Sequence, residues 1–307
     1  MVTPACTGPE RRWVRQEKMS NVLAIDVGGT KVAVGLVDSL GRLTDKDQIQ
    51  SENPEEGPLY DRILALARKC LAGSPTVVDA IGVGCGGPAR NSYQLVSPLN
   101  LPEWRDFPLR EKLENDLQAI VYVDNDAKAL ALAEGWVGTA KGCANYLAMV
   151  VSTGVGGGIV LNGSLLDGAD GNAGHIGHIF VDPAGGEDAN GVSGLLEGSA
   201  SGSALHRALG VPPKEASNKT REQVGVWVGR AVASVANLLD LKLAIVSGSV
   251  ALGFGDIFFA SAQRTIDQLS KIDHAQGTKI VPSVLADEGP LIGAGAVAWR
   301  ALGRTIL

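Results

Sequence analysis

Short apolar runs bounded by glycine-rich turns alternate along the chain with segments whose apolar residues recur at helical spacing. Residues 21–27 (NVLAIDV) and 31–38 (KVAVGLVD) are apolar runs separated by Gly-Gly-Thr. This arrangement predicts a β-hairpin with a tight turn. We expect residues 42–50 to add a third strand, and residues 58–71 (PLYDRILALARKCL) to form an amphipathic helix. Strands followed by a helix indicate an α/β protein.

The same succession continues and then begins a second time. Residues 145–151 and 155–161 again form a strand, a polar glycine turn and a strand, as residues 21–38 do. Two α/β halves of common design predict a ligand cleft between them, lined by the glycine turns of both. The other expected strands are 77–85, 119–123, 243–246 and 279–284, and the other expected helices are 106–117, 125–138, 220–239, 254–269 and one beginning near residue 291.

Composition limits the kinds of partner. The formal charge is 27 minus 33, or −6, and no basic stripe is visible, so we expect no nucleic acid partner. No apolar run reaches the roughly 18 residues of a membrane span, and the first residues lack an apolar signal region. Cys6, Cys70, Cys85 and Cys143 show no CxxC spacing. We therefore expect a cytoplasmic protein without a disulfide framework, in which residues 1–20 are a disordered extension.

Both glycine turns are candidate phosphate-binding sites. A turn without side chains lets backbone N–H groups approach phosphate oxygens, and threonine or serine adds a hydroxyl donor. An aspartate at the end of the first strand is suited to orient the hydration shell of Mg²⁺. A plain hairpin turn is the structural alternative for either motif taken alone. Neither motif is a Walker P-loop, because the chain has no GxxxxGK[ST] sequence. The candidate residues are Asp26, with magnesium bound through water, Gly28, Gly29, Thr30 and Lys31 in the first turn, and Ser152, Thr153, Gly154 and Gly156 in the second.

A third motif supplies a candidate base. In Val-Asp-Asn-Asp (residues 123–126), the last carboxylate lies where a strand meets a helix, at the expected mouth of the cleft. Phosphoryl transfer needs positioning and one residue that accepts the proton of the nucleophile, a role that aspartate fills in kinases. Simple capping of the helix by Asn125 or Asp126 is the alternative, and capping and chemistry are compatible.

Four motifs in this order make the chain similar to the ROK family of bacterial sugar kinases and repressors. They are LAIDVGGTKVAVGLVD, VDNDAKALALAE, VVSTGVGGGIVLNGSLL and GNAGHIGH, and the resemblance covers residues 21–304. It implies a two-domain actin-like (sugar kinase–Hsp70–actin) ATPase fold of α/β class with an interdomain cleft. We expect a small domain of residues 21–124 plus 290–307 and a large domain of residues 125–289. The resemblance also implies Mg-ATP, a hexose substrate and a homodimer.

The resemblance assigns roles to individual residues. Asp126 matches the catalytic base and also contacts the sugar, Asn125 and Asn100 match sugar ligands, and Gly248 matches a turn near adenosine in which Ser247 replaces a glycine. Glu197 matches a glutamate that contacts sugar hydroxyls.

The GHIGH segment, residues 174–178, departs from the pattern of most glucose-directed members. They have Glu-x-Gly-His, and His175 stands at the glutamate position here. Imidazole can donate as well as accept a hydrogen bond. GHIGH is similar to the segment of bacterial N-acetylmannosamine kinases, so we assign His175 and His178 to substrate binding.

The structural zinc site of the family is the second departure. The family's three cysteine ligands are replaced by Asp188, Asn190 and Leu195, so we expect no zinc at His178.

We therefore predict ATP-dependent phosphorylation of a hexose at its 6-hydroxyl, with N-acetylmannosamine the first candidate and glucose the alternative. A function of another class is a ROK-type transcriptional regulator without its DNA-binding domain. Only 25 residues precede Asp26, whereas a winged-helix domain takes roughly 70, and no helix-turn-helix pattern is seen.

Overall fold

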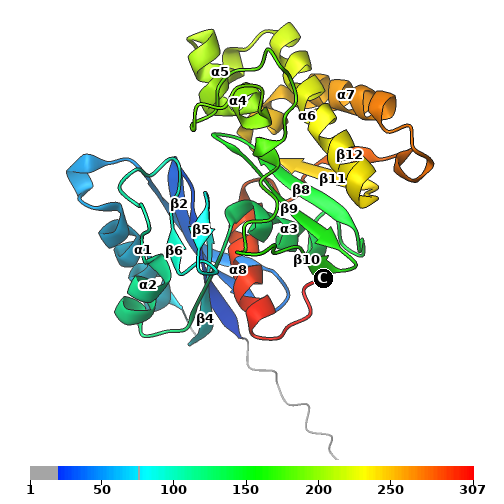
Figure 1. Cartoon of the computed structure of the whole chain (residues 1–307). Helices are drawn as coiled ribbons and strands as arrows, with labels where there is room; N and C mark the ends of the chain where they lie inside the picture. Colours follow the sequence, from blue (N-terminus) through cyan, green and yellow to red (C-terminus); the bar gives the residue numbers. More distant parts are fainter. Residues whose placement is uncertain (1–19, 75–76) are drawn as a thin grey trace, which may run out of the picture.

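The computed structural model describes residues 20–74 and 77–307, and it contains two five-stranded sheets of the same design. The strand orders are β3-β2-β1-β4-β7 and β10-β9-β8-β11-β12. In each sheet an antiparallel hairpin stands beside two strands that run parallel to its first strand. The repetition expected from the sequence is thus present in the order and direction of the strands (Figure 1).

The first lobe is built on the sheet of β1 to β4 and β7. Alternate residues of β1 enter different cores: Leu23, Ile25 and Val27 face α1 and α2, whereas Val22 and Ala24 face the centre of the molecule. A strand buried on both faces is the reason that residues 21–27 are apolar without alternation. The elements are β1 (Asn21–Val27), β2 (Lys31–Asp38), β3 (Leu43–Gln50), α1 (Leu59–Gly73), β4 (Val78–Cys85), β5 (Ala89–Arg90), β6 (Leu95–Val96), α2 (Leu109–Leu117) and β7 (Val121–Asp124).

The second lobe repeats this plan with longer helices. Helices α6 and α7 pack against each other and against one face of the second sheet, where β8 contributes Leu147, Met149 and Val151 to the core. Gly255 interrupts α7 with φ 59° and ψ −141°. The elements are β8 (Tyr146–Val151), β9 (Val155–Leu161), β10 (Ser164–Leu165), α4 (Leu196–Ala200), α5 (Gly202–Leu209), α6 (Asn218–Leu239), β11 (Leu243–Ser247), α7 (Ser249–Leu269) and β12 (Lys279–Pro282).

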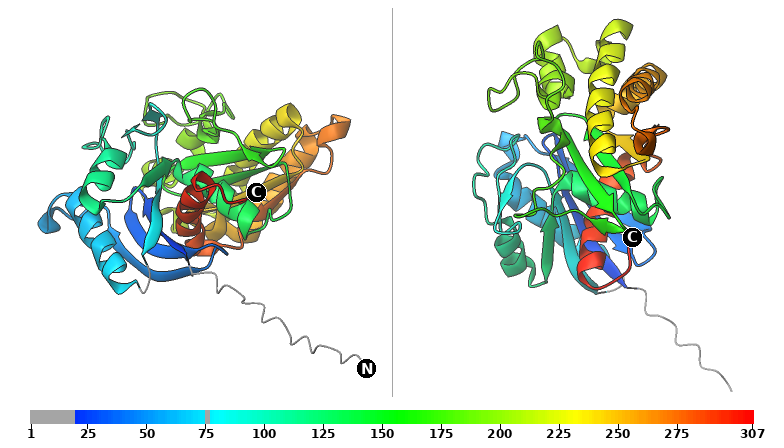
Figure 2. Two further views of the ribbon diagram at one scale, coloured as in Figure 1. Left: turned by 90° about the horizontal axis from the view of Figure 1, so that it is seen from below. Right: turned by 45° about the vertical axis from the view of Figure 1, so that its right-hand side comes forward.

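Two helices join the lobes by exchanging sides. Helix α3 (Asp126–Trp136) follows the first sheet but packs on β8 and β9, and α8 (Gly289–Ala301) follows the second sheet but packs on β1 and β4. The two helices also pack on each other, and a Cβ at Gly293 would lie 2.5 Å from the backbone of Ala129. Figure 2 shows α8 between the strands of the two lobes. This pair closes the base of the cleft and forms the central core.

The expected elements are present, with shifted ends. Helix α7 begins at Ser249 rather than 254, α2 begins at Leu109 rather than 106, and β7 begins at Val121. β5, β6, β10, α4 and α5 were not expected from the sequence, because elements of eight residues or fewer leave too short a periodic pattern. The domain boundaries at 124/125 and 289/290 stay predictions, and the expected extension lies, except for Ser20, outside the described residues. None of the helices over 20–74 and 77–307 is long and apolar enough to cross a membrane.

Candidate active site

A cleft of about 910 Å³ lies between the lobes, and every site residue expected from the sequence lines it. The first lobe contributes the β1–β2 turn and the loop around Asn100. The second contributes the β8–β9 turn, the segment with His175 and the beginnings of α3 and α4. The lining includes Asp26, Gly28, Gly29, Thr30, Lys31, Asn100, Asn125, Asp126, Ser152, Thr153, Gly154, Gly156, His175, His178, Glu197 and Gly248. Residues far apart in the sequence are thus brought together as expected, although their individual roles stay proposals.

The two glycine turns meet within this cleft. The hydroxyl oxygens of Thr30 and Thr153 are 3.3 Å apart, one from each lobe. The first turn is tight, since the Gly28 N–H donates to the Lys31 carbonyl at 3.1 Å, and a Cβ at Gly28 would lie 2.9 Å from that carbonyl. Backbone and hydroxyl donors from both lobes therefore converge on one place, as binding of a phosphate chain requires.

Two carboxyl groups stand beside these turns. Asp26, near the end of β1, is 8% exposed, and burial, with the negative charge of Asp126, raises its pKa to about 7 although Lys31 acts in the opposite direction. Burial also raises the pKa of Asp126, and the charge of Glu197 adds to the rise, whereas the Ala127 N–H that donates to Oδ1 at 2.8 Å opposes it. Perturbed carboxyl groups in a cleft are typical of functional sites.

Asn125 combines a cap with a place in the cleft. Its Oδ1 accepts hydrogen bonds from the backbone of Ala127 at 3.0 Å and Lys128 at 3.3 Å, so it caps α3. The capping interpretation of this motif is therefore correct, and it leaves the amide nitrogen to donate towards a ligand. Asn100 lies against the first glycine turn, since a Cβ at Gly29 would stand 2.7 Å from the Cβ of Asn100.

The second lobe closes the other end of the cleft. Glu197, in the first turn of α4, accepts the Val155 N–H at 2.8 Å, which ties α4 to the beginning of β9. The rings of His175 and His178 stand edge to face with centroids 5.9 Å apart. Burial, helped by the positive charges of His178 and Lys128, lowers the pKa of His175, so that its neutral imidazole is favoured, with one donor and one acceptor nitrogen.

The residue 22–301 segment matches the family model described as the ROK family. The chain belongs to the ROK family. It is 30% identical to a glucokinase of Halalkalibacterium halodurans, covering 89% of this chain and 93% of the relative. It is 34% identical to an N-acetylmannosamine kinase of Haemophilus influenzae, covering 76% and 82%. A Streptomyces griseus ROK family glucokinase, solved in complex with glucose and AMPPNP, superposes with a TM-score of 0.78 at 27% identity, covering 90% of this chain and 98% of that one. The expected actin-like α/β fold is confirmed.

The loop in which the ROK resemblance implies zinc is organised here around Asp188. One oxygen of this buried carboxylate accepts the backbone N–H groups of Asn190 at 2.8 Å and Val192 at 2.9 Å. The other lies 3.6 Å from Nε2 of His178. Leu195 is buried. Over residues 20–74 and 77–307, no three His, Cys, Asp or Glu side chains are grouped to hold a metal. That the purified protein carries no zinc stays a prediction, which elemental analysis tests.

Some residues of the ROK cleft gave no usable signal in the sequence. Gly86 leaves room for Asp126, since a Cβ there would lie 3.3 Å from Oδ2, and the sequence indicated only a turn. The Ser249 hydroxyl is 3.1 Å from that of Ser152, so the start of α7 supports the second glycine turn. Lys128 does not line the cleft, and its sequence position gives no sign of its burial: lysine is rarely fully buried, yet here it is 1% exposed.

Proposed function

We propose that this ROK-family sugar kinase transfers the γ-phosphoryl group of ATP to the 6-hydroxyl of N-acetylmannosamine. The observation that carries the proposal is the meeting of Asp126 with two glycine turns, one from each lobe, in a single cleft. The cleft also contains His175, at the position where the resemblance to glucose-directed members implies a glutamate. The N-acetylmannosamine kinase relative at 34% identity supports this substrate.

Asp126 is the proposed base. A carboxylate with a raised pKa takes a proton more readily than an ordinary one, and Gly86 leaves space beside Oδ2, since a Cβ there would lie 3.3 Å away. As the sugar oxygen gives its proton to Asp126, it forms a bond to the γ-phosphorus while the bond from that phosphorus to the bridging oxygen of ADP breaks. The Ala127 N–H on Oδ1 holds the carboxylate in place during this step.

The two glycine turns are the proposed phosphate-binding elements, and Asp26 is the proposed magnesium-binding residue. The Gly28 and Ser152 N–H groups close the two turns themselves, by donating to the Lys31 and Gly154 carbonyls. The backbone N–H groups of residues 29–30 and 153–154, with the hydroxyls of Thr30 and Thr153, donate to phosphate oxygens. Asp26 is a hard oxygen donor at the cleft wall, a chemistry that fits the hydration shell of Mg²⁺. Bound there, the ion would neutralise charge that develops on the transferred group.

Glucose is the alternative substrate. The glucokinase relative at 30% identity covers more of the chain than the N-acetylmannosamine kinase does, and Asn100, Asn125 and Glu197 belong to the set expected for either sugar. A regulator without catalysis is the alternative of another class.

An ADP-release assay over N-acetylmannosamine, glucose, mannose, N-acetylglucosamine and galactose tests the proposal. We expect the highest kcat/KM with N-acetylmannosamine. A highest value with glucose would replace the substrate by the alternative, and no turnover with any sugar, despite sugar binding by calorimetry, would favour a regulator.

His175→Glu tests the source of the preference. A polar group left without a partner costs about 1–3 kcal/mol, so the ratio of kcat/KM for N-acetylmannosamine to that for glucose should fall roughly ten- to a hundredfold. His206→Glu, the same exchange at an exposed position of α5, is the control and should leave the ratio unchanged. An unchanged ratio in His175→Glu would remove His175 from sugar selection.

A further inference from the structure

A buried lysine lies two residues beyond the proposed base, and its ammonium group is fully bonded. Lys128 is 1% exposed. Its Nζ lies 2.7 Å from Oδ1 of Asp124, 2.9 Å from Oδ1 of Asp167 and 3.0 Å from the carbonyl oxygen of Gly171. An ammonium group has three N–H donors, and each has one acceptor here. This lysine is therefore a structural cation within the fold and does not face a ligand.

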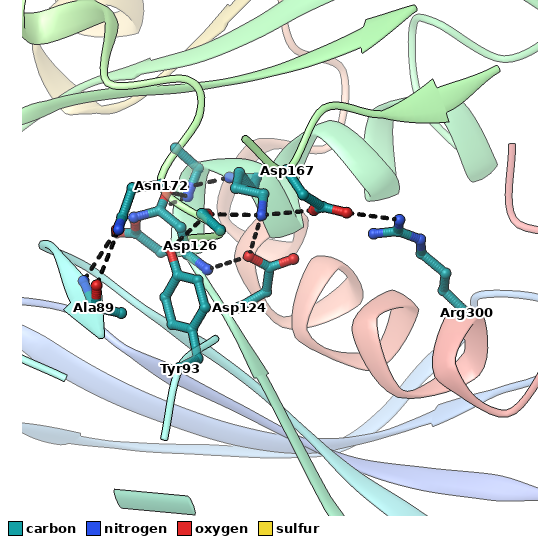
Figure 3. Close-up of polar contacts among 11 residues, drawn as sticks. Ala89, Tyr93, Asp124, Asp126, Asp167, Asn172 and Arg300 are labelled. Atoms are coloured by element: carbon teal, nitrogen blue, oxygen red, sulfur yellow. Dashed lines mark hydrogen bonds and ion pairs between the residues drawn. The ribbon is translucent and has the colours of Figure 1, made fainter. Parts of the chain in front are cut away.

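Its acceptors belong to two different parts of the molecule. Asp124 ends β7 of the first sheet, whereas Asp167 and Gly171 belong to the segment that follows β10 in the second lobe. We call residues 167–175 the His175 strap. Asp167 also pairs with Arg300 of α8 at 3.4 Å, and Figure 3 shows Asp124, Asp167 and Arg300 converging from three separate elements.

The strap is fixed to the first lobe by two more contacts. The side chain of Asn172 accepts the Ala89 N–H at 3.0 Å and donates to the Ala89 carbonyl at 2.9 Å, as a neighbouring strand would. The Tyr93 hydroxyl donates to the carbonyl of Gly171 at 3.4 Å (Figure 3). The strap thus bridges the lobes on the side of the cleft where His175 lies.

The end of the strap is equally constrained. Gly174 has φ 103°, and a Cβ there would lie 2.2 Å from the carbonyl oxygen of Gly157 in β9. With Asp167 held at one end and Gly174 at the other, the backbone that presents His175 has little freedom to shift.

We propose that Lys128, through Asp167 and Gly171, is a positioning residue that sets the place of His175 at the sugar end of the cleft. The inference rests on the proposed function, because His175 is its sugar-selecting residue. Lys128 occupies the first turn of α3, the same turn that carries Asp126. The first turn of α3 therefore carries Asp126 itself and, through Lys128 and the strap, also holds His175. The distance between the two groups is thus set by one helix turn.

The charges of the cluster agree with this role. Burial raises the pKa of Asp124, and the ammonium group of Lys128 counteracts the rise. For Asp167 the opposing effect of burial is outweighed by Lys128 and Arg300, so its pKa lies below the usual value. The lysine therefore favours the ionised form of both carboxylates, and the strap loses an anchor when its ion pair with Asp167 is broken.

Asp167→Asn is the variant that tests positioning. Lys128→Met would leave Asp124 and Asp167 without their shared cation inside the fold, whereas the Asp167 side chain is 51% exposed and tolerates loss of charge. Asp170→Asn, the same exchange at an exposed residue of the same strap, is the matched control. Among the described residues, Asp170 has no hydrogen bond or ion pair.

We expect Asp167→Asn to raise KM for the sugar roughly ten- to a hundredfold while KM for ATP changes less than about threefold. Asp170→Asn should leave both constants unchanged. In a His175→Ala background, Asp167→Asn should have almost no further effect on KM for the sugar, because the two act through one contact. Equal losses for sugar and ATP, or effects that add in the double variant, would overturn the proposal.

A readout without turnover separates this inference from the proposed function. The chain has four histidines, so the ring signal of His175 can be assigned by NMR from its loss in His175→Ala. Asp167→Asn should shift or broaden that signal, and Asp170→Asn should not. An unmoved signal contradicts the positioning role, whereas failure of the wild type to phosphorylate any hexose contradicts only the proposed function.

Discussion

The two carboxyl groups proposed as base and as magnesium-binding group have different surroundings in this cleft. Asp126 has one oxygen held by a backbone N–H at 2.8 Å, and its burial disfavours the charged form. Asp26 is buried beside Lys31 and near a second carboxylate. The first arrangement suits proton acceptance and the second suits a cation, in line with the roles proposed for these two aspartates.

Replacing the base should separate chemistry from folding. Asp126→Asn retains an oxygen that can accept the Ala127 N–H but cannot take a proton. We expect kcat to fall by roughly two to four orders of magnitude. The melting temperature should stay equal or rise, because a buried charge is removed. Sugar affinity by calorimetry should change little. Turnover within about threefold of the wild type would remove Asp126 from the mechanism.

Asp26 should make stability depend on pH in a particular direction. Its pKa is about 7 in the folded chain, against the ordinary value of 3.8 that applies to the unfolded chain. From about pH 4 to about pH 7 the folded chain therefore holds a proton that the unfolded chain has lost, and the free energy of unfolding falls as pH rises through this window.

Urea unfolding of wild type and Asp26→Asn across this range isolates the effect of Asp26 and of its coupling to Asp126, since groups that do not interact with Asp26 cancel in the difference. As pH rises, the free energy of unfolding of Asp26→Asn should increase relative to that of the wild type by up to a few kcal/mol. A difference that stays constant with pH would contradict the raised pKa. Because only the ionised carboxyl holds a cation, the Mg²⁺ concentration for half-maximal activity should fall with rising pH and level off above about pH 7.

At the scale of elements, glycines decide how closely the pieces of the site approach. Gly248, before α7, has φ 101°, and a Cβ there would lie 2.4 Å from the carbonyl oxygen of Val151. The end of β8 and the start of α7 can meet at the cleft only without that carbon. Glycine makes up 40 of the 307 residues, about 13% against a typical usage of roughly 7%. Close backbone contacts such as this one, as well as turns, require it.

Gly248→Ala should therefore strain both strand and helix. We expect a loss of about 1–3 kcal/mol in unfolding free energy and a higher KM for ATP. Gly253→Ala is the matched control, because Gly253 lies inside α7 with nothing within 4 Å of its added Cβ. It should be neutral or stabilising by up to about 1 kcal/mol. Equal effects of both variants would mean that the Val151 contact does not matter.

At the scale of the whole molecule, the exchange of α3 and α8 makes each lobe depend on the other. Helix α3 follows the first sheet in the sequence but covers the second, and α8 follows the second sheet but covers the first. Gly293 lets the two helices pack backbone to backbone. The cleft lies above this shared core, so ligands that fill it contact both lobes.

Sugar and nucleotide should consequently stabilise the whole chain together. With Asp126→Asn, which prevents turnover, each ligand at about 100 times its Kd should add about 2.7 kcal/mol to the free energy of unfolding. Calorimetry should show one transition that moves upward with each ligand and further with both. Two transitions, of which only one responds, would show lobes that unfold independently. The homodimer stays a prediction that light scattering tests.

The sequence alone determined the two hairpins, the α/β order and the cleft residues carried by short motifs. Apolar runs, glycine turns and the Asn125 cap are local features, and their consequences for the backbone extend only over a few residues. For that reason Asp26 and Asp126 could be named before their meeting was seen.

Only the tertiary structure decided what lies next to what. Lys128 bonds Asp167, 39 residues away, and is buried on a helix whose pattern gives it no distinction from an exposed lysine. The pKa of Asp26 is raised by burial and, in addition, by a carboxylate 100 residues further along, which approaches it because β1 and β7 flank β4 in one sheet. Burial and charge pairing arise from contacts between distant segments, and the fold creates those contacts.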